Sequence, residues 1–292
     1  MIHPLPPEFS NRRIRCAVAG AGGSGSQMLS GLARMDVALR ALGHPGLDVC
    51  VFDPDTVTEA NIGRQLFSPS DLGANKASTL VNRINLFFGL NWNACGALYK
   101  AGGRWNDQAA DILIGCVDSA AARRDLAQTR YHYWLDLGNT DKKGQVILGT
   151  RRRGKKTPIG KSLMEVFTEN GMHPDNDYPT NRAQAEKKSG LTHKQYLARR
   201  KQLRKSVQYH TPPRPKLVTE IFPQLKNARK REDNTPSCSL AEALERQDLF
   251  INQTVATFAL QLLWQFIRQG GLDIHGYFIN LETGKVTPLP IK

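Results

Sequence analysis

The chain has 292 residues, 40% of them hydrophobic and 23% charged, a composition typical of a globular protein rather than a disordered one. No apolar run reaches the ~18–20 residues of a membrane-spanning helix, and the N-terminus lacks the apolar core of a signal peptide, so we expect a cytoplasmic protein without a membrane partner. The five cysteines include no CxxC pair, which argues against a disulfide framework and against a structural zinc. A formal net charge of +14 by itself fits nucleic acid, an anionic membrane surface or an acidic protein as a partner.

Short apolar runs bounded by turn residues alternate with helical patterns along the first half of the chain. The runs lie at 14–19, 48–52, 94–99, 111–117, 133–137 and 145–148. The helical patterns lie at 25–42, 75–88 and 119–131. Buried strands alternating with helices are typical of a doubly wound, Rossmann-like α/β sheet.

One segment carries all of the excess positive charge. Residues 151–231 contain 21 Lys/Arg and 6 Asp/Glu, whereas the rest of the chain contains 19 and 20. Within it, Thr192 and Gln195 have the spacing of a capping box, which predicts a basic helix to about 207. The segment is too polar to form its own core, so we interpret it as a partly irregular insertion. The predicted parts are a nucleotide-binding part (12–150), the insertion (151–235) and a C-terminal part (236–292).

The C-terminal part completes the α/β fold. Residues 239–268 have the pattern of one or two buried helices. Thr283-Gly284 separates two short strand patterns, at 277–281 and 286–289, which indicates a hairpin.

A glycine-rich motif follows the first strand and opens a helix. Its glycines are Gly20, Gly22, Gly23 and Gly25. Glycine lets the backbone approach an anion closely, and a helix N-terminus offers free N–H groups, so the motif predicts nucleotide phosphates. Asp53, just after the second strand, is placed to bind ribose hydroxyls. These features alone fit an NAD-dependent dehydrogenase equally well.

Two cations and a second carboxylate favour a triphosphate. Arg64 and Lys76 follow Asp53, and cations are needed where pyrophosphate leaves. Asp118 ends the fourth strand pattern, at the sheet edge where doubly wound folds bind ligands. A carboxylate beside phosphates suits Mg²⁺, so we expect ATP and Mg²⁺ as cofactors.

The motifs GAGGSGS, DPDTVTEANIGRQ, GANK and VDSAAAR resemble the ThiF/MoeB/HesA adenylyltransferases, relatives of the ubiquitin-activating enzymes. The resemblance covers about 12–150 and 236–290, and NRRIRCAVAGAGGSGSQ, YWLDLGN and HGYFINLETGKVTPLPI are similar to the ThiF-family subfamily of the PRTRC plasmid cassette. It implies a bacterial, possibly plasmid-encoded homodimer that adenylates the C-terminal carboxylate of a ubiquitin-like protein.

The resemblance also implies roles for individual residues. The glycines Gly20, Gly22, Gly23 and Gly25 would cradle phosphates and Asp53 would hold the ribose. The remaining roles fall to Asn61, Arg64 and Gln65 as phosphate contacts, Lys76 as the neutralising cation and Asp118 as the Mg²⁺ ligand. Arg123, five residues after Asp118, is expected to form a structural ion pair.

Two positions depart from the family pattern or extend it. Relatives lend an arginine across the dimer from about 20 residues before the glycine motif, but here only Arg12 and Arg13 precede it, and closely. Some relatives pass the acyl group to a cysteine, for which Cys238 is the candidate, with a buried structural thiol as the alternative. Cys16, Cys50, Cys95 and Cys116 fall in strand patterns and are interpreted as core residues.

Two other functions stay open at this stage. One is a nucleotide-binding family member without catalysis. The other is a DNA-associated plasmid-maintenance factor that acts through the basic insertion. The insertion could equally be a solvated face or a docking surface for an acidic ubiquitin-like partner, and these are preferred to DNA because its aromatic residues are not interleaved with its cations.

Overall fold

The structure is a computed structural model that describes residues 2–100, 109–151, 157–158, 192–206, 209–210, 214–227 and 247–292. The chain divides into two compact units. The first combines Met1–Arg152 with Arg214–Lys292, and the second is Arg153–Pro213.

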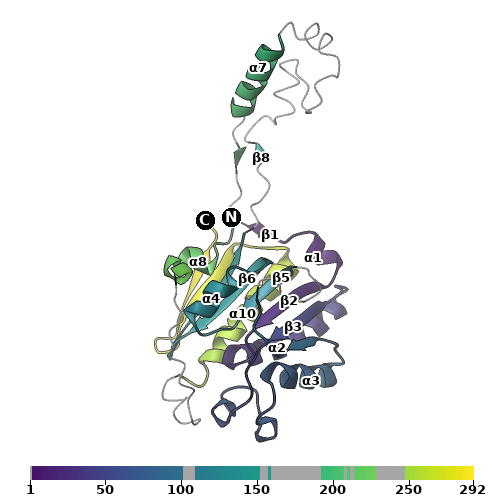
Figure 1. The fold of residues 1–292 in the computed structure, drawn as a ribbon, viewed down its shortest axis with the longest axis vertical. Coiled ribbons are helices and arrows are strands. Elements are labelled where there is room, and N and C mark those ends of the chain that lie inside the picture. The colour runs from purple at the N-terminus through teal and green to yellow at the C-terminus, as the bar shows by residue number, and fades with distance from the viewer. Residues whose placement is uncertain are drawn as a thin grey trace. The chain divides into compact units, whose positions relative to one another are not determined.

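The first unit is built on an eight-stranded sheet of order β12-β11-β7-β6-β5-β2-β3-β4 (Figure 1). Its parallel strands are β4 (Asn93–Cys95), β3 (Leu47–Phe52), β2 (Ile14–Ala19), β5 (Ala110–Gly115) and β6 (Tyr131–Asn139). Its antiparallel strands are β7 (Lys143–Thr150), β11 (Ile274–Asn280) and β12 (Lys285–Pro290).

The chain direction across the sheet reverses beside β2. It runs from β2 through β3 to the edge strand β4, then returns to β5 on the other side of β2. Val18 therefore pairs with Val51 of β3 on one side and with Ile114 of β5 on the other. The carboxyl ends of β2 and β5 form the topological switch point, where open α/β sheets bind ligands.

Helices cover both faces of the sheet, which confirms the doubly wound α/β prediction. α2 (Gly23–Ala41), α3 (Lys76–Phe88) and α10 (Ile251–Gln269) share one apolar core with one face of the sheet. α4 (Ala120–Leu126), α8 (Val218–Ile221) and the turn η3 (Pro223–Asn227) lie on the other face. Successive strand residues alternate between the two cores: Val18 belongs to the first and Ala19 to the second.

Short elements complete the first unit. They are β1 (His3–Pro4) paired with β10 (Gly271–Leu272), α1 (Glu8–Asn11), η1 (Glu59–Asn61) and η2 (Pro69–Asp71). None of the helices that the structure describes combines the length and the hydropathy needed to cross a bilayer.

Several element boundaries differ from the predictions. Of the helices predicted over 239–268, the structure describes α10, which begins at Ile251, and residues 239–246 lie outside the described residues. The third strand is shorter than predicted, ending at Cys95. The helix predicted over 119–131 ends at Leu126, because Thr129 closes the turn with a hydrogen bond to the Leu126 carbonyl before β6 begins. β5 ends at Gly115, so Cys116 lies after the strand rather than within it.

The second unit contains the predicted basic helix, α7 (His193–Ser206). The predicted capping box is present, since Thr192 and Gln195 exchange hydrogen bonds. β8 (Thr157–Pro158) pairs with β9 (Tyr209–His210). Residues 214–227 belong to the first unit, where Thr150 of β7 donates its N–H to the Pro215 carbonyl.

Candidate nucleotide-binding site

The glycine turn joins β2 to α2 at the switch point. Gly20 adopts φ +96°, and its N–H donates to the Phe52 carbonyl at the end of β3. A Cβ on Gly20 would lie 2.7 Å from the Cys116 carbonyl oxygen, just beyond β5. The turn is thus held where the carboxyl ends of three strands meet, and only glycine fits at its first position.

The other three glycines of the motif differ in what a side chain at their position would contact. A Cβ on Gly25 would lie 2.0 Å from the Gly20 carbonyl oxygen, and one on Gly23 would lie 2.6 Å from the Asn252 carboxamide. By contrast, the described atoms nearest to a Cβ on Gly22 belong to Gln65, at 3.8 and 3.9 Å. The protein's own packing therefore requires Gly20, Gly23 and Gly25, whereas a Cβ on residue 22 would make only ordinary van der Waals contact with Gln65.

Asp53, the first residue after β3, is buried and holds the glycine turn. Its Oδ2 accepts the Ala21 N–H at 2.6 Å, and its Oδ1 accepts the Asp55 N–H at 2.9 Å. Burial raises the pKa of Asp53, although these two hydrogen bonds and the charge of Lys76 oppose the rise. The structure thus assigns Asp53 a local role in fixing the turn, and its contact with a ribose stays a prediction.

Lys76 is buried at the start of α3, and its ion-pair partner is Asp55, two residues after Asp53. Its Nζ lies 3.2 Å from Asp55 Oδ2, an acidic partner that the sequence analysis did not name. Asn75 caps the helix by accepting the Ser78 N–H, and its amide donates to the Asp53 carbonyl. The cap therefore ties the start of α3 to the end of β3, which brings Lys76 to the segment that follows β3, where its ammonium pairs with Asp55.

Arg64 is a half-buried cation. Its Nη1 donates to Gln247 Oε1 at 2.5 Å, while its Nε is buried without a hydrogen-bond partner among the described residues. Burial lowers the pKa of Arg64, and the negative charge of Asp118 opposes that effect. Asp118 must therefore lie near enough for its charge to act on this guanidinium.

Two polar residues flank Arg64 in sequence, and one of them contacts the turn. Gln65 is buried beside Gly22, and its Oε1 likewise has no hydrogen-bond partner in the described part of the chain. Asn61 is buried, and its Oδ1 accepts the N–H and the hydroxyl of Thr58. These two bonds use the Asn61 oxygen and leave its amide nitrogen out of them.

Asp118 is exposed in the connection between β5 and α4. Arg123 donates to the Asp118 carbonyl and forms a buried ion pair with Asp136, with Nε 3.1 Å from Oδ1. Gln145 donates to the same carboxylate. The prediction that Arg123 forms a structural pair is confirmed, and this pair anchors the backbone that presents the Asp118 side chain.

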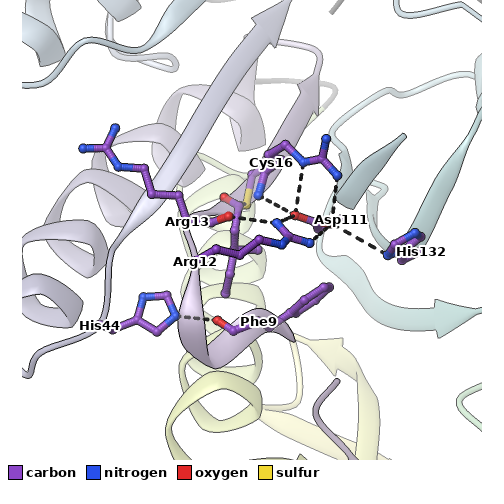
Figure 2. A network of polar contacts seen from close by, with 9 residues as sticks. Phe9, Arg12, Arg13, Cys16, His44, Asp111 and His132 are labelled. Carbon is purple, nitrogen blue, oxygen red and sulfur yellow. Dashed lines mark hydrogen bonds and ion pairs between the residues drawn. The ribbon is translucent and has the colours of Figure 1, made fainter. Parts of the chain in front are cut away.

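Arg12 and Arg13 lie at the other end of β2, about 20 Å from the glycine turn for six strand residues. Figure 2 shows Arg12 directed at Asp111 of β5, with its two terminal nitrogens 2.6 and 2.8 Å from the carboxylate oxygens, while the Arg13 side chain extends away. Burial alone would raise the pKa of Asp111, but hydrogen bonds from Arg12 and Arg15 bring it below its ordinary value. Arg12 is therefore engaged within its own chain, and an exchange of either arginine across a dimer stays a prediction.

Cys238 lies outside the described residues, so its role also stays a prediction. Cys16 and Cys50 are buried strand residues, as predicted; burial raises the pKa of Cys16 and raises that of Cys50 to about 12. Cys95 and Cys116 are only partly buried, although burial of its thiol also raises the pKa of Cys116. Thiols with raised pKa values are poor nucleophiles at neutral pH.

An open, mainly parallel sheet with a glycine turn at its switch point defines a Rossmann-like α/β protein. The model of the ThiF family matches residues 10–287, and the chain belongs to that family. No curated protein matches the sequence.

Solved structures with a similar fold include E. coli MccB crystallised with ATP and the protein PaaA. MccB shares 13% identity at a TM-score of 0.49, covering 97% of this chain and 65% of that chain. PaaA shares 13% identity at a TM-score of 0.48, covering 95% of this chain and 64% of that chain. The chain thus spans a little under two thirds of the length of these proteins.

Proposed function

We propose that this ThiF-family protein binds ATP at the glycine turn and adenylates a carboxylate of a protein substrate. The main support for the proposal is a pair of buried polar atoms near the glycine turn that lack hydrogen-bond partners among the described residues. Among the described residues, the Oε1 of the buried Gln65 amide beside Gly22 has no hydrogen-bond partner, and neither does the buried Nε of its sequence neighbour Arg64. Buried polar atoms are normally paired, so these two atoms point to a polar ligand.

The charges favour a triphosphate over a dinucleotide. Lys76 is a buried cation and Arg64 a half-buried one, and burying a charge is costly unless an opposite charge approaches it. The only carboxylate within ion-pair distance of Lys76 among the described residues is that of Asp55, which is 65% exposed and so neutralises it weakly. The two cations therefore retain charge for phosphate oxygens.

Asp118 fits a supporting role for Mg²⁺. The described residues contain no group of three or more His, Cys, Asp or Glu that would hold a metal by themselves. Mg²⁺ commonly binds through one or two carboxylates together with phosphate oxygens, and Asp118 presents an exposed carboxylate near Arg64. When bound, the ion would neutralise developing charge on the phosphates.

The proposed reaction needs positioning and charge stabilisation rather than a base. The substrate carboxylate is already ionised at neutral pH, so its oxygen attacks the α-phosphorus directly. A new bond forms between that oxygen and the α-phosphorus, the bond from the α-phosphorus to the bridging oxygen breaks, and pyrophosphate leaves with the electron pair. Arg64 and Lys76 stabilise the negative charge that grows on the leaving group.

The finer assignments follow from the family resemblance and are part of the proposal. The substrate is the C-terminal carboxylate of a ubiquitin-like protein, and the enzyme is a bacterial homodimer of the PRTRC subfamily. Cys238 then receives the acyl group: its thiolate attacks the carbonyl carbon of the acyl adenylate, a thioester forms and AMP leaves. The buried strand thiols Cys16 and Cys50 are unsuited to that step because burial raises the pKa of each.

Hydroxylamine trapping tests the proposal, because hydroxylamine converts an acyl adenylate into a stable hydroxamate. The purified protein, ATP, Mg²⁺ and the ubiquitin-like protein encoded nearest to this gene should give a substrate hydroxamate detectable by intact-protein mass spectrometry. Substrate with an amidated C-terminus is the matched control and should give none. ATP binding without hydroxamate would identify a non-catalytic nucleotide-binding member instead.

A further inference from the structure

Two side chains near the start of α10 connect the glycine turn to Arg64. Gln247 and Asn252 come from the C-terminal part of the chain, more than 180 residues from Arg64 in sequence. Asn252 lies in the first turn of α10 and is 4% exposed. Neither residue belongs to the motifs that predict the site.

The hydrogen bonds between them form a continuous chain. The Ser24 hydroxyl donates to Asn252 Oδ1 at 3.1 Å, and Asn252 Nδ2 donates to Gln247 Oε1 at 2.9 Å. Arg64 Nη1 donates to the same Gln247 oxygen. Because both neighbours of Gln247 Oε1 donate to it, this oxygen is fixed as the acceptor and the Gln247 amide nitrogen must point away.

The Asn252 carboxamide also packs closely against the glycine turn. The Asn252 carboxamide occupies the space where a side chain on residue 23 would lie, 2.6 Å from a Cβ placed there. A side chain at position 23 would therefore clash with Asn252, and the start of α10 packs directly on the start of α2 through this contact. A shift of Asn252 would be transmitted to Ser24 in the same turn.

The side chains that connect the glycine turn to Arg64 carry no charge, and this affects how Arg64 can bind a ligand. Gln247 holds one terminal nitrogen of the guanidinium but brings no charge, so the cation is oriented without being cancelled. A carboxylate in the same place would accept the same hydrogen bonds and would neutralise Arg64. Since Nη1 is held, the buried Nε, which has no hydrogen-bond partner in the part of the chain that the structure describes, is left for another acceptor.

We propose that Gln247 and Asn252 are positioning residues that hold Arg64 and the glycine turn in register for a nucleotide triphosphate. This inference rests on the proposed ATP site. It assigns to the C-terminal part of the chain an indirect contribution to phosphate binding, made by uncharged side chains that orient Arg64 and the glycine turn.

The test compares two glutamines of the same helix region. Gln247→Glu adds a negative charge beside Arg64, whereas Gln253→Glu adds the same charge at an exposed position of α10 and is the matched control. Isothermal titration should show the Kd for ATP rising at least about tenfold in Gln247→Glu, since one charge-assisted contact is weakened. AMP binding should change much less, and Gln253→Glu should bind both nucleotides like the wild type.

A second comparison separates positioning from folding. In an Arg64→Ala background, Gln247→Ala should cause no further loss of ATP affinity, because its effect acts through the guanidinium. Additive losses, or Gln247→Glu binding ATP as tightly as the wild type, would overturn the inference while leaving the ATP site intact. A wild-type protein that binds no ATP would refute the proposed function, and this inference with it.

Discussion

Alanine substitutions within the glycine turn separate a phosphate-binding role from a purely structural one. At Gly22 a methyl group would make ordinary van der Waals contact with the Gln65 carboxamide, without a clash. At Gly25 the same methyl group would lie 2.0 Å from the Gly20 carbonyl oxygen, so the backbone would have to move. The first change should therefore affect ligand binding and the second should affect folding.

The expected magnitudes follow from these distances. In Gly22→Ala the methyl group would displace a phosphate from at least one backbone N–H, and a hydrogen bond to a charged group contributes about 1.5–3 kcal/mol. The Kd for ATP should rise by roughly 10- to 100-fold. The free energy of unfolding should change by less than about 1 kcal/mol, because Ala at 3.8 Å from its neighbours neither clashes nor leaves a cavity. Gly25→Ala should lose about 3 kcal/mol or more, as severe overpacking does.

Two assays on each purified variant measure these quantities. Isothermal titration gives the Kd for ATP, and urea denaturation followed by circular dichroism gives the free energy of unfolding. Gly22→Ala with unchanged ATP affinity would show that the phosphates do not approach this backbone. A Gly25→Ala variant as stable as the wild type would refute the steric reading of the turn.

Three further predictions concern carboxylates. Asp118→Ala should reduce adenylation at least about 100-fold in a pyrophosphate-release assay. Because this side chain is exposed, the thermal unfolding temperature should not change. A variant that stays active would show that Asp118 does not bind the metal ion. Asp136→Ala should cost about 3–5 kcal/mol in urea denaturation, because it leaves the Arg123 charge buried and unpaired, and a loss under 1 kcal/mol would contradict that. The pKa of Asp111 is lowered in the folded state, so its ion pair with Arg12 stabilises the fold above about pH 4 and loses that effect as pH falls through the folded pKa. The stability difference between wild type and Asp111→Asn should therefore be constant from pH 7 to about pH 5 and shrink below it, and a difference that grows on acidification would reverse the assigned sign.

The fold could be predicted from the sequence because its strands are buried on both faces. Central strands such as β2 and β5 are continuous apolar runs ended by glycine or a polar residue, and such runs are visible without any tertiary information. The edge strand β4 was overestimated because its residues are mostly exposed, so burial does not mark where it ends. The boundary of α4 depends on Thr129, whose hydrogen bond closes the turn only once the chain enters β6.

The candidate site was predicted only as far as its motifs extend. Asp53, Arg64 and Lys76 were named because spacing after the glycine motif indicates them, and the structure places them at one sheet edge. The sequence does not reveal Gln247 and Asn252, because their uncharged side chains carry no spacing signal and their partners Arg64 and Ser24 lie 183 and 228 residues away. The reason for glycine at position 23 was likewise hidden, since it depends on packing against Asn252.

The structure shows where the cations behind the net charge of +14 lie and which of them pair with carboxylates. Cations of the α/β unit such as Arg12, Arg123 and Arg214 pair with carboxylates, whereas α7 in the second unit contains six Lys/Arg and no acidic residue. The cations proposed to meet phosphates, Arg64 and Lys76, belong to the first unit. The nucleotide site that we propose is therefore assigned to cations of the first unit.

Pyrophosphate exchange tests the central claim most directly. The protein is incubated with ATP, Mg²⁺, labelled pyrophosphate and the ubiquitin-like protein encoded nearest to this gene, with and without a free C-terminal carboxylate. We predict that label enters ATP only when the free carboxylate is present, because exchange requires reversible formation of the acyl adenylate. Intact ATP binding with no carboxylate-dependent exchange would contradict the proposed adenylation.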